Sequence, residues 1–181
     1  QDKEKLTGTL AELRDRKARL QKLVKKLESS SSGKYIDEAR PFSATKGHLP
    51  WPVSGRVLVG FGTRENPALG TMHASNGIEI EAADNQPISA VGAGRVVFAD
   101  AFKGYGNLVI VDHGQSYHSL YGNAARLKAK VGQRVAAGDV LAFAGYPGTS
   151  GLYFEIRHHG VPLDPMVWIG TPGAPSVRRK D

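Results

Sequence analysis

From Leu49 onward the chain alternates short apolar runs with turn-forming residues, at intervals of about ten residues. The apolar runs occupy residues 57–59, 78–80, 94–98, 108–111, 140–143 and 152–156. Gly, Pro, Asp and Asn separate them, and most of the 22 glycines lie in this part, where many turns need a positive φ. This spacing predicts an antiparallel β-sandwich or barrel, with no further long helix after residue 49.

The first 28 residues carry a different periodicity. Their apolar positions recur in alternating steps of four and three, and a single lysine interrupts the pattern. The positions are Leu6, Leu10, Leu13, Lys17, Leu20, Val24 and Leu27. With Lys, Arg and Glu on the flanks, residues 1–28 are predicted to be the C-terminal part of a longer coiled coil, because so short a helix would be marginal alone. The alternative is a single amphipathic helix that lies on its own domain.

A linker is expected between these two parts, and a basic tail after them. Four serines and Gly33 end the predicted helix, and residues 29–48 form the linker. A possible short helix within it would use Tyr35, Ile36, Ala39 and Phe42, with Pro41 opposing it. The domain itself is predicted over residues 49–170, followed by the tail over 171–181.

Net charge and composition exclude several classes of function. The formal charge is +7, but residues 1–28 hold nine Lys or Arg against five Asp or Glu, and the tail is also basic. The domain between them is therefore near neutral, which argues against a nucleic-acid partner. No apolar run approaches the roughly 20 residues of a membrane helix, and the sequence contains no cysteine for disulfide or thiol chemistry. Without a signal-peptide pattern at Gln1, we expect a cytoplasmic protein or a trimmed secreted one.

Three stretches carry the most specific pattern in the chain: Ser75-Asn76-Gly77-Ile78-Glu79, Leu120-Tyr121-Gly122-Asn123 and Gly151-Leu152-Tyr153-Phe154-Glu155. They resemble the LytM/lysostaphin-type metallopeptidases, in which the same stretches carry His-x-Gly-x-Asp, Tyr-x-His and His-x-His-Phe-Glu. The resemblance puts the three family metal ligands at Ser75, Glu79 and Tyr153. It puts the two catalytic histidines at Asn123 and Gly151.

These substitutions remove the chemistry that the resemblance would otherwise imply. Zinc catalysis needs about three nitrogen, sulfur or carboxylate ligands and an open position for water. Of the five positions, only Glu79 could still bind a metal, since neutral hydroxyls are poor ligands. The sequence therefore predicts no enzyme, no metal and no cofactor. The rival hypothesis, a relocated zinc site, would need His73 beside Glu79 and a third ligand from His113 or His118.

Two further stretches, residues 87–97 and 131–141, repeat a strand-turn-strand theme. They resemble the duplicated hybrid motif of lipoyl and biotinyl carrier domains, to which the LytM fold is similar. A carrier would need an exposed Asp-Lys or Met-Lys at a hairpin tip, and neither stretch contains one. The repeat is thus interpreted as part of the β fold and not as a carrier site.

The resemblance narrows to the EnvC-type murein hydrolase activators over about residues 49–170. The matching segments are residues 49–55, Gly104-Tyr105-Gly106, Asp112-His113-Gly114, Ser119-Leu120-Tyr121-Gly122 and residues 152–157. This family implies a periplasmic protein that cuts nothing itself and activates a zinc N-acetylmuramoyl-L-alanine amidase during septal peptidoglycan splitting. It also implies that the coiled coil contacts an FtsE-FtsX-like membrane complex.

On this hypothesis the degenerate groove binds a regulatory helix of the amidase. The predicted groove residues are Asn76, Glu79, Tyr105, Leu108, Tyr121, Tyr153 and Arg157. Tyrosines are typical anchors of binding surfaces, and Arg157 could pair with an acidic residue of the partner. Each could instead serve packing or an internal ion pair. A non-catalytic peptidoglycan-binding module is the second hypothesis, and a coiled coil that folds back to block the groove is a further one.

Overall fold

The computed structural model describes residues 2–30, 41–66 and 71–170. The order of elements is a long helix, a 3₁₀ turn, twelve strands and a four-residue helix. The helices are α1 (Asp2–Ser30), η1 (Phe42–Thr45) and α2 (Pro165–Trp168). The strands are β1 (Val57–Val59), β2 (Gly62–Asn66), β3 (Thr71–Ser75), β4 (Ile78–Glu81), β5 (Pro87–Ser89), β6 (Gly94–Ala101), β7 (Asn107–Asp112), β8 (Tyr117–Leu127), β9 (Arg134–Val135), β10 (Val140–Ala144), β11 (Gly151–His158) and β12 (Val161–Leu163).

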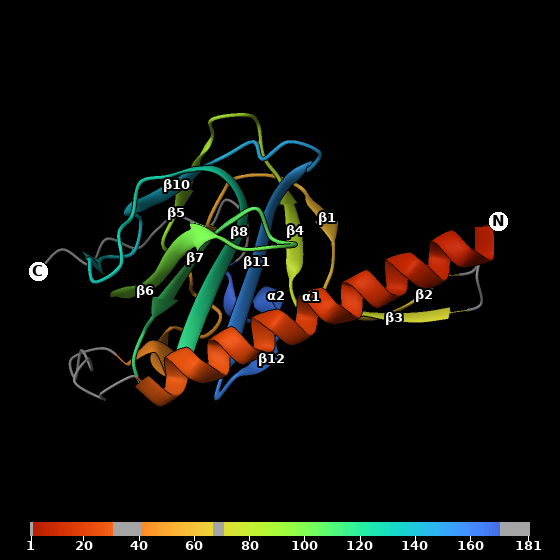
Figure 1. Cartoon of the computed structure of the whole chain (residues 1–181). Helices are drawn as coiled ribbons and strands as arrows, with labels where there is room; N and C mark the ends of the chain where they lie inside the picture. The colour runs from red at the N-terminus through yellow and green to blue at the C-terminus, as the bar shows by residue number, and fades with distance from the viewer. Residues whose placement is uncertain (1, 31–40, 67–70, 171–181) are drawn as a thin grey trace, which may run out of the picture.

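The mainly antiparallel β architecture confirms the predicted fold class. One sheet runs in the order β1-β4-β11-β8-β7-β6-β9, with β10 joining β5 and β8, and β12 joining β11. All six apolar runs predicted from the sequence form strands. The longest strand, β8, was missed, because Tyr117-His118-Ser119 and Gly122-Asn123 interrupt its apolar pattern. The remaining pair, β2 and β3, forms a hairpin that projects away from the sheet (Figure 1).

The main core lies on one face of this sheet. Successive side chains of a strand point to opposite faces, and those that point into this core, such as Ile78, Val109 and Phe154, are fully buried. Trp168 of α2 and Phe42 of η1 close one end, with their rings 5.2 Å apart and nearly parallel. The short helix predicted before Pro41 lies outside the described residues, and the described turn follows that proline instead. The predicted basic tail also lies outside the described residues.

The other face of the sheet is covered by α1, which crosses β8 and β11 and continues alongside the β2–β3 hairpin (Figure 1). An N-terminal helix is thus confirmed. From Leu20 onward its apolar seam packs against the protein's own sheet, where Leu20 and Val24 are completely buried. This is the arrangement of the alternative expectation, a single helix on its own domain, while pairing in a longer coiled coil stays a prediction. Among the described helices, none is long and apolar enough to cross a membrane.

Candidate partner-binding groove

The face beneath α1 is a second apolar cluster, separate from the main core. We call it the α1-facing cluster; it comprises Leu20, Val24, Tyr105, Leu108, Ile110, Leu120 and Tyr153. Two residues come from the helix and five from β7, β8, β11 and the β6–β7 turn. Tyr105 and Tyr153 lie at its centre, with ring centroids 5.3 Å apart. Three of the predicted groove residues, Tyr105, Leu108 and Tyr153, therefore lie together on the face that receives a helix.

A buried ionic chain runs beside this cluster along β11. The Tyr153 hydroxyl donates to one oxygen of Glu155 at 2.6 Å, and Arg157 Nε donates to the other at 2.6 Å. These three side chains alternate along one strand and so share a face. Burial, followed by the charge of Glu155, raises the pKa of Tyr153 well above its usual value. The phenol therefore stays protonated and acts as a hydrogen-bond donor.

The helix contributes its own polar groups to this chain. Arg157 Nη1 donates to Gln21 Oε1 at 2.6 Å and to the Gly160 carbonyl at 3.3 Å. Lys17, the interruption in the seam, donates to the Ala74 carbonyl of β3. Burial lowers the pKa of Lys17. The lysine therefore marks the point where the helix leaves the apolar sheet for the backbone of the hairpin.

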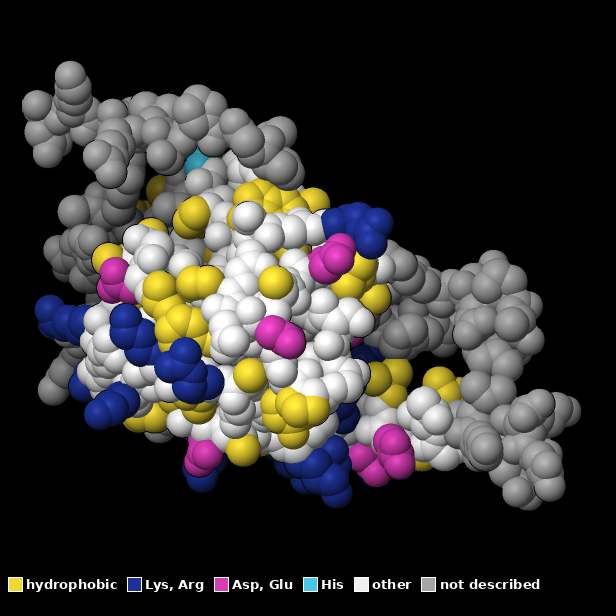
Figure 2. Space-filling model, turned by 90° about the horizontal axis from the view of Figure 1, so that it is seen from above, with side chains coloured by type: hydrophobic (Ala, Val, Ile, Leu, Met, Phe, Trp, Pro, Cys, Tyr) yellow, Lys and Arg dark blue, Asp and Glu magenta, His cyan; other side chains and the backbone are white. Residues whose placement is uncertain are grey.

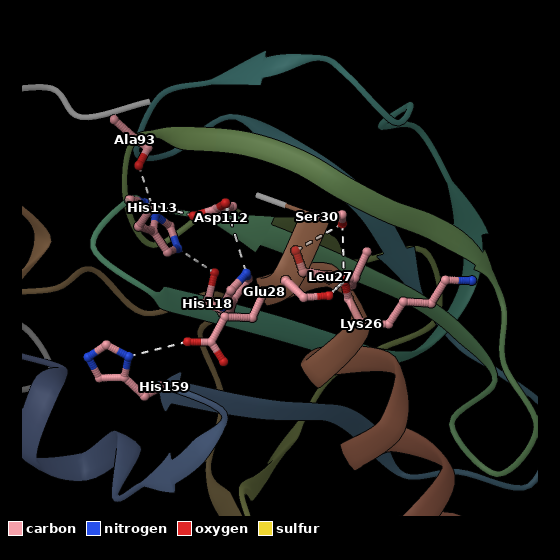
Figure 3. A network of polar contacts seen from close by, with 12 residues as sticks. Lys26, Leu27, Glu28, Ser30, Ala93, Asp112, His113, His118 and His159 are labelled. Atoms are coloured by element: carbon pink, nitrogen blue, oxygen red, sulfur yellow. Dashed lines mark hydrogen bonds and ion pairs between the residues drawn. The ribbon is translucent and has the colours of Figure 1, made fainter. Parts of the chain in front are cut away.

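Two more polar contacts hold α1 against the sheet. Near its middle, the Arg16 guanidinium lies 4.9 Å from the centre of the Tyr105 ring and donates to the Gly104 carbonyl. At its C-terminal end, Glu28 points toward the ring of His159, with Oε1 and Nδ1 3.3 Å apart (Figure 3). Burial raises the pKa of Tyr105 to about 12. Apolar packing thus supplies the area of this contact, and four polar anchors fix its register.

A cleft stays open beside the helix, with a volume of about 630 Å³. Its polar lining includes Arg16, Glu79, Lys103, Asn123 and Tyr146, and Gly151 forms part of its floor. Four of the five family catalytic positions lie in this region. Glu79 and Asn123 line the cleft, Gly151 opens β11, and Tyr153 lies directly opposite Glu79 in the β4–β11 register.

The donor set of these positions does not fit zinc. The Ser75 hydroxyl donates to the Gly77 carbonyl at 2.8 Å, and the Tyr153 hydroxyl is committed to Glu155. At Gly151 an added Cβ would overlap the Ile80 carbonyl oxygen, so the backbone leaves no room for a histidine. Over the described residues, no three His, Cys, Asp or Glu side chains come close enough to share a metal ion. The His73 side chain, invoked for a relocated site, lies outside the described part.

Tyr121 does not join the other predicted groove residues. Its side chain is fully buried in the main core, where its ring packs 5.4 Å from that of Phe154. The Tyr121 hydroxyl lies 2.8 Å from Ser119 Oγ and accepts a hydrogen bond from the Val91 amide at 3.0 Å. The alternation of β8 changes after it, because Asn123 adopts φ 61° and turns toward the cleft. Asn76, also predicted for the groove, is half-buried in the β3–β4 turn.

Below the groove a polar chain crosses the core from β8 to the turn before β6. His113 Nδ1 donates to the Ala93 carbonyl at 2.8 Å, and its Nε2 lies 2.6 Å from Ser119 Oγ (Figure 3). Burial lowers the pKa of His113 to about 4, so the ring is neutral and Nε2 accepts a hydrogen bond from the Ser119 hydroxyl. Burial likewise lowers the pKa of His118, whose Nε2 lies 4.0 Å from Asp112. Sequence reasoning missed this chain because the pairing of β7 with β8, which places Asp112 opposite His118, brings its residues together.

The comparisons agree with this architecture. Residues 73–165 match the model of peptidase family M23. Over 130 residues the chain is 37% identical to the murein hydrolase activator EnvC of Escherichia coli K12, covering 70% of this chain and 30% of that protein. Over 122 residues it is 37% identical to the murein hydrolase activator NlpD of Salmonella typhimurium, covering 66% of this chain and 30% of that one.

A solved structure shares the fold. A zinc-containing peptidase from Vibrio cholerae superposes with a TM-score of 0.60 at 24% identity, over 67% of this chain and 40% of that chain. The chain spans about a third of the length of the curated relatives it matches. The family match covers more than half of the sequence and contains the β4, β8 and β11 positions described above. The chain belongs to peptidase family M23.

Proposed function

We propose that this protein is a non-catalytic activator of a periplasmic zinc N-acetylmuramoyl-L-alanine amidase, in the manner of the EnvC-type activators. The observation that carries the proposal is the packing of Leu20 and Val24 of α1 onto Tyr105, Leu108 and Tyr153. A surface that buries the apolar seam of one amphipathic helix has the shape and chemistry to receive another. The regulatory helix of the amidase would take the place that α1 holds.

Arg157 gives this surface a charge preference. Its Nη1 is satisfied by an amide oxygen of Gln21, and no acceptor within the described part of the chain takes a hydrogen bond from its Nη2. A carboxylate on an incoming helix could accept from both nitrogens, and charge-assisted bidentate pairs are stronger than neutral ones. The proposed partner helix therefore carries an acidic residue at the level of Gln21.

In this scheme α1 is a self-inhibitor that must leave before the amidase helix binds. The two helices compete for one surface, so activation is a population shift between a covered and an open groove. The coiled coil expected upstream would transmit the release signal from an FtsE-FtsX-like membrane complex. The relative amounts of the two states would follow from the difference in affinity of the two helices for Tyr105, Tyr153 and Arg157.

The proposed compartment is the periplasm, where the septal peptidoglycan and its amidases are located. Relatives named murein hydrolase activators support this placement, as does a relative in Pseudomonas aeruginosa named as a lipoprotein NlpD/LppB homolog. No nucleic acid is proposed as a partner, since the positive charge of the sequence gathers at the helix and the tail.

A second candidate function is a non-catalytic peptidoglycan-binding module. The open cleft beside α1 favours it, because Glu79, Asn123 and Tyr146 offer hydrogen-bonding groups to a stem peptide or glycan. Binding of the polymer and activation of an amidase are compatible. The two functions differ in how they depend on α1. While α1 is docked, the cleft is open and could bind the polymer, whereas the face that would bind the amidase helix is covered.

The test is dye release from labelled peptidoglycan by the purified chain, alone with added zinc and together with a resting amidase from the same organism. The proposal expects no release by the chain alone and release when both proteins are present, with less protein needed for a variant whose α1 is undocked than for the intact chain. Chelator-sensitive release by the chain alone would contradict it, by revealing a working zinc site. Polymer binding without release in either arm, including with a variant whose α1 is undocked, would favour the peptidoglycan-binding module.

A further inference from the structure

An exposed apolar tip surrounded by cations lies at the end of the sheet opposite the groove. Val131 occupies the turn between β8 and β9 and is 64% exposed, the largest exposed fraction among the large hydrophobic side chains of the described residues. Arg95, Lys128, Lys130 and Arg134 lie around this turn, and all four are exposed. Lys and Arg side chains gather along the left edge of Figure 2, on the side where Figure 1 places β6 and β10.

The backbone of this turn is held firmly in place. The Gly132 amide donates to the Val96 carbonyl at 2.8 Å, and the Val96 amide donates to the Gln133 carbonyl at 2.9 Å. Arg95 Nε reaches the Gly132 carbonyl at 3.3 Å. Gly132 adopts φ +92°, the left-handed region that the turn requires and that glycine accepts without strain. Val131 is therefore presented to solvent by a rigid scaffold.

The cations are arranged on the solvent side of the same segment. Lys128 and Lys130 are exposed while Ala129 between them is buried, and Arg95 lies directly opposite Arg134 in the β6–β9 register. Asp139 is an acidic group of the neighbouring turn, and one of its oxygens accepts from the Ala136 amide at 2.8 Å. A second carboxylate, Asp112, lies opposite Arg95 in the β6–β7 register. Four cations against these two carboxylates still leave the surface basic, with Lys128 and Lys130 exposed at its tip, although the domain as a whole is near neutral.

We propose that this surface docks onto an anionic phospholipid membrane, with Val131 inserted among the headgroups. An apolar tip within a ring of Lys and Arg matches the interfacial region, where the cations meet lipid phosphates and the side chain enters the acyl boundary. A single-stranded nucleic acid fits less well, because it needs open aromatic faces for stacking. The nearby ring of Phe143 is covered by the Arg126 guanidinium, 4.0 Å from its centre.

Membrane docking and groove binding can occur together. In the sheet order, β9 is the last strand on one side, whereas β4 and β11 of the groove lie toward the other. A domain attached through Val131 therefore keeps its helix-binding face away from the membrane contact. This inference does not depend on the amidase proposal, because it rests on a different surface and a different ligand.

The test is co-sedimentation of the full chain with vesicles of phosphatidylcholine alone and with about a third phosphatidylglycerol. We expect binding only to the anionic vesicles, weakened by raising the salt concentration. Lys128→Gln/Lys130→Gln should lower the affinity about 25-fold, at about fivefold for each lysine near the surface. The matched control, Lys22→Gln/Lys25→Gln, removes the same charge from the exposed side of α1 and should change the affinity less than about twofold.

Variants of Val131 distinguish insertion of an apolar side chain from charge attraction alone. Val131→Ser should weaken vesicle binding, and Val131→Trp should tighten it, with unchanged thermal midpoints because the side chain is exposed. Equal binding to neutral vesicles, or equal losses in the two lysine pairs, would overturn the proposal. So would binding to soluble polyphosphate without binding to vesicles, which would mark the surface as a site for a free polyanion.

Discussion

Arg157 of β11 donates a hydrogen bond to Gln21 of α1 across a separation of 136 residues, and the two atoms lie 2.6 Å apart. The guanidinium is completely buried and also pairs with Glu155. This contact joins the helix to the buried ionic chain of the groove. The docking of α1 is therefore linked to the hydrogen bonds and ion pairs of the groove residues. The predictions below test the docking of the helix and the buried ion pair separately.

Leu20→Glu should undock α1. The leucine is completely buried in the α1-facing cluster, and placing a carboxylate there costs several kcal/mol unless the helix moves away. Amide hydrogen exchange across β8 and β11 should become faster, and amidase stimulation should need roughly tenfold less protein if the groove is uncovered. Ala18→Glu adds the same charge on the exposed side of the helix and should change neither measurement. Faster exchange without increased stimulation would reject self-inhibition.

Arg157→Met should destabilise the fold by roughly 3–5 kcal/mol, because it leaves Glu155 as a buried charge without its partner. The double variant Glu155→Gln/Arg157→Met removes both charges and should recover part of this loss. Chemical denaturation, compared at the same pH, measures both values. If the double variant is no more stable than Arg157→Met, the loss comes from packing of the long side chain and not from the unpaired carboxylate.

Acid should destabilise the protein through His113. Its pKa is about 4 in the folded state, below its ordinary value of 6.5, so the unfolded chain binds the proton first. This stability is fully present above about pH 6.5 and is lost as the pH falls toward 4, by roughly 3 kcal/mol in total. Denaturation midpoints measured between pH 7 and pH 4 should fall more steeply in the wild type than in His113→Gln. An equal slope in the two proteins would show that His113 does not cause the loss.

Gly151→Ala should be strongly destabilising, although it is a minimal change. An added Cβ would overlap the Ile80 carbonyl oxygen of the neighbouring strand, so β4 and β11 would have to separate. The thermal midpoint should fall by several degrees, and Gly151→His should fall further without gaining zinc. Gly8→Ala is the matched control, because no atom lies within 4 Å of the added carbon in α1. It should be neutral or stabilising by up to about 1 kcal/mol.

Much of the fold followed from local sequence patterns. Apolar runs such as residues 108–111 and 152–156 became β7 and β11, because strands with a buried face need little more than β-branched or aromatic residues between turns. The departures from the family pattern at Ser75, Asn123 and Gly151 were likewise visible in the sequence, since the residue type at each position is known without the structure. The heptad pattern correctly predicted an N-terminal helix, which the structure describes over Asp2–Ser30.

Only the tertiary structure decided which surface each element would cover. A heptad pattern predicts that one side of a helix is apolar, but it does not say what that side packs against. Leu20 and Val24 pack on the sheet because Tyr105, Leu108 and Tyr153 form an apolar face there. Strand register placed Tyr121 in the main core and Tyr153 in the groove, although both were predicted to line the same surface. One residue of irregularity in β8, at Asn123, changes which face a side chain occupies. Such choices depend on contacts between residues far apart in the sequence, and local patterns carry no information about them.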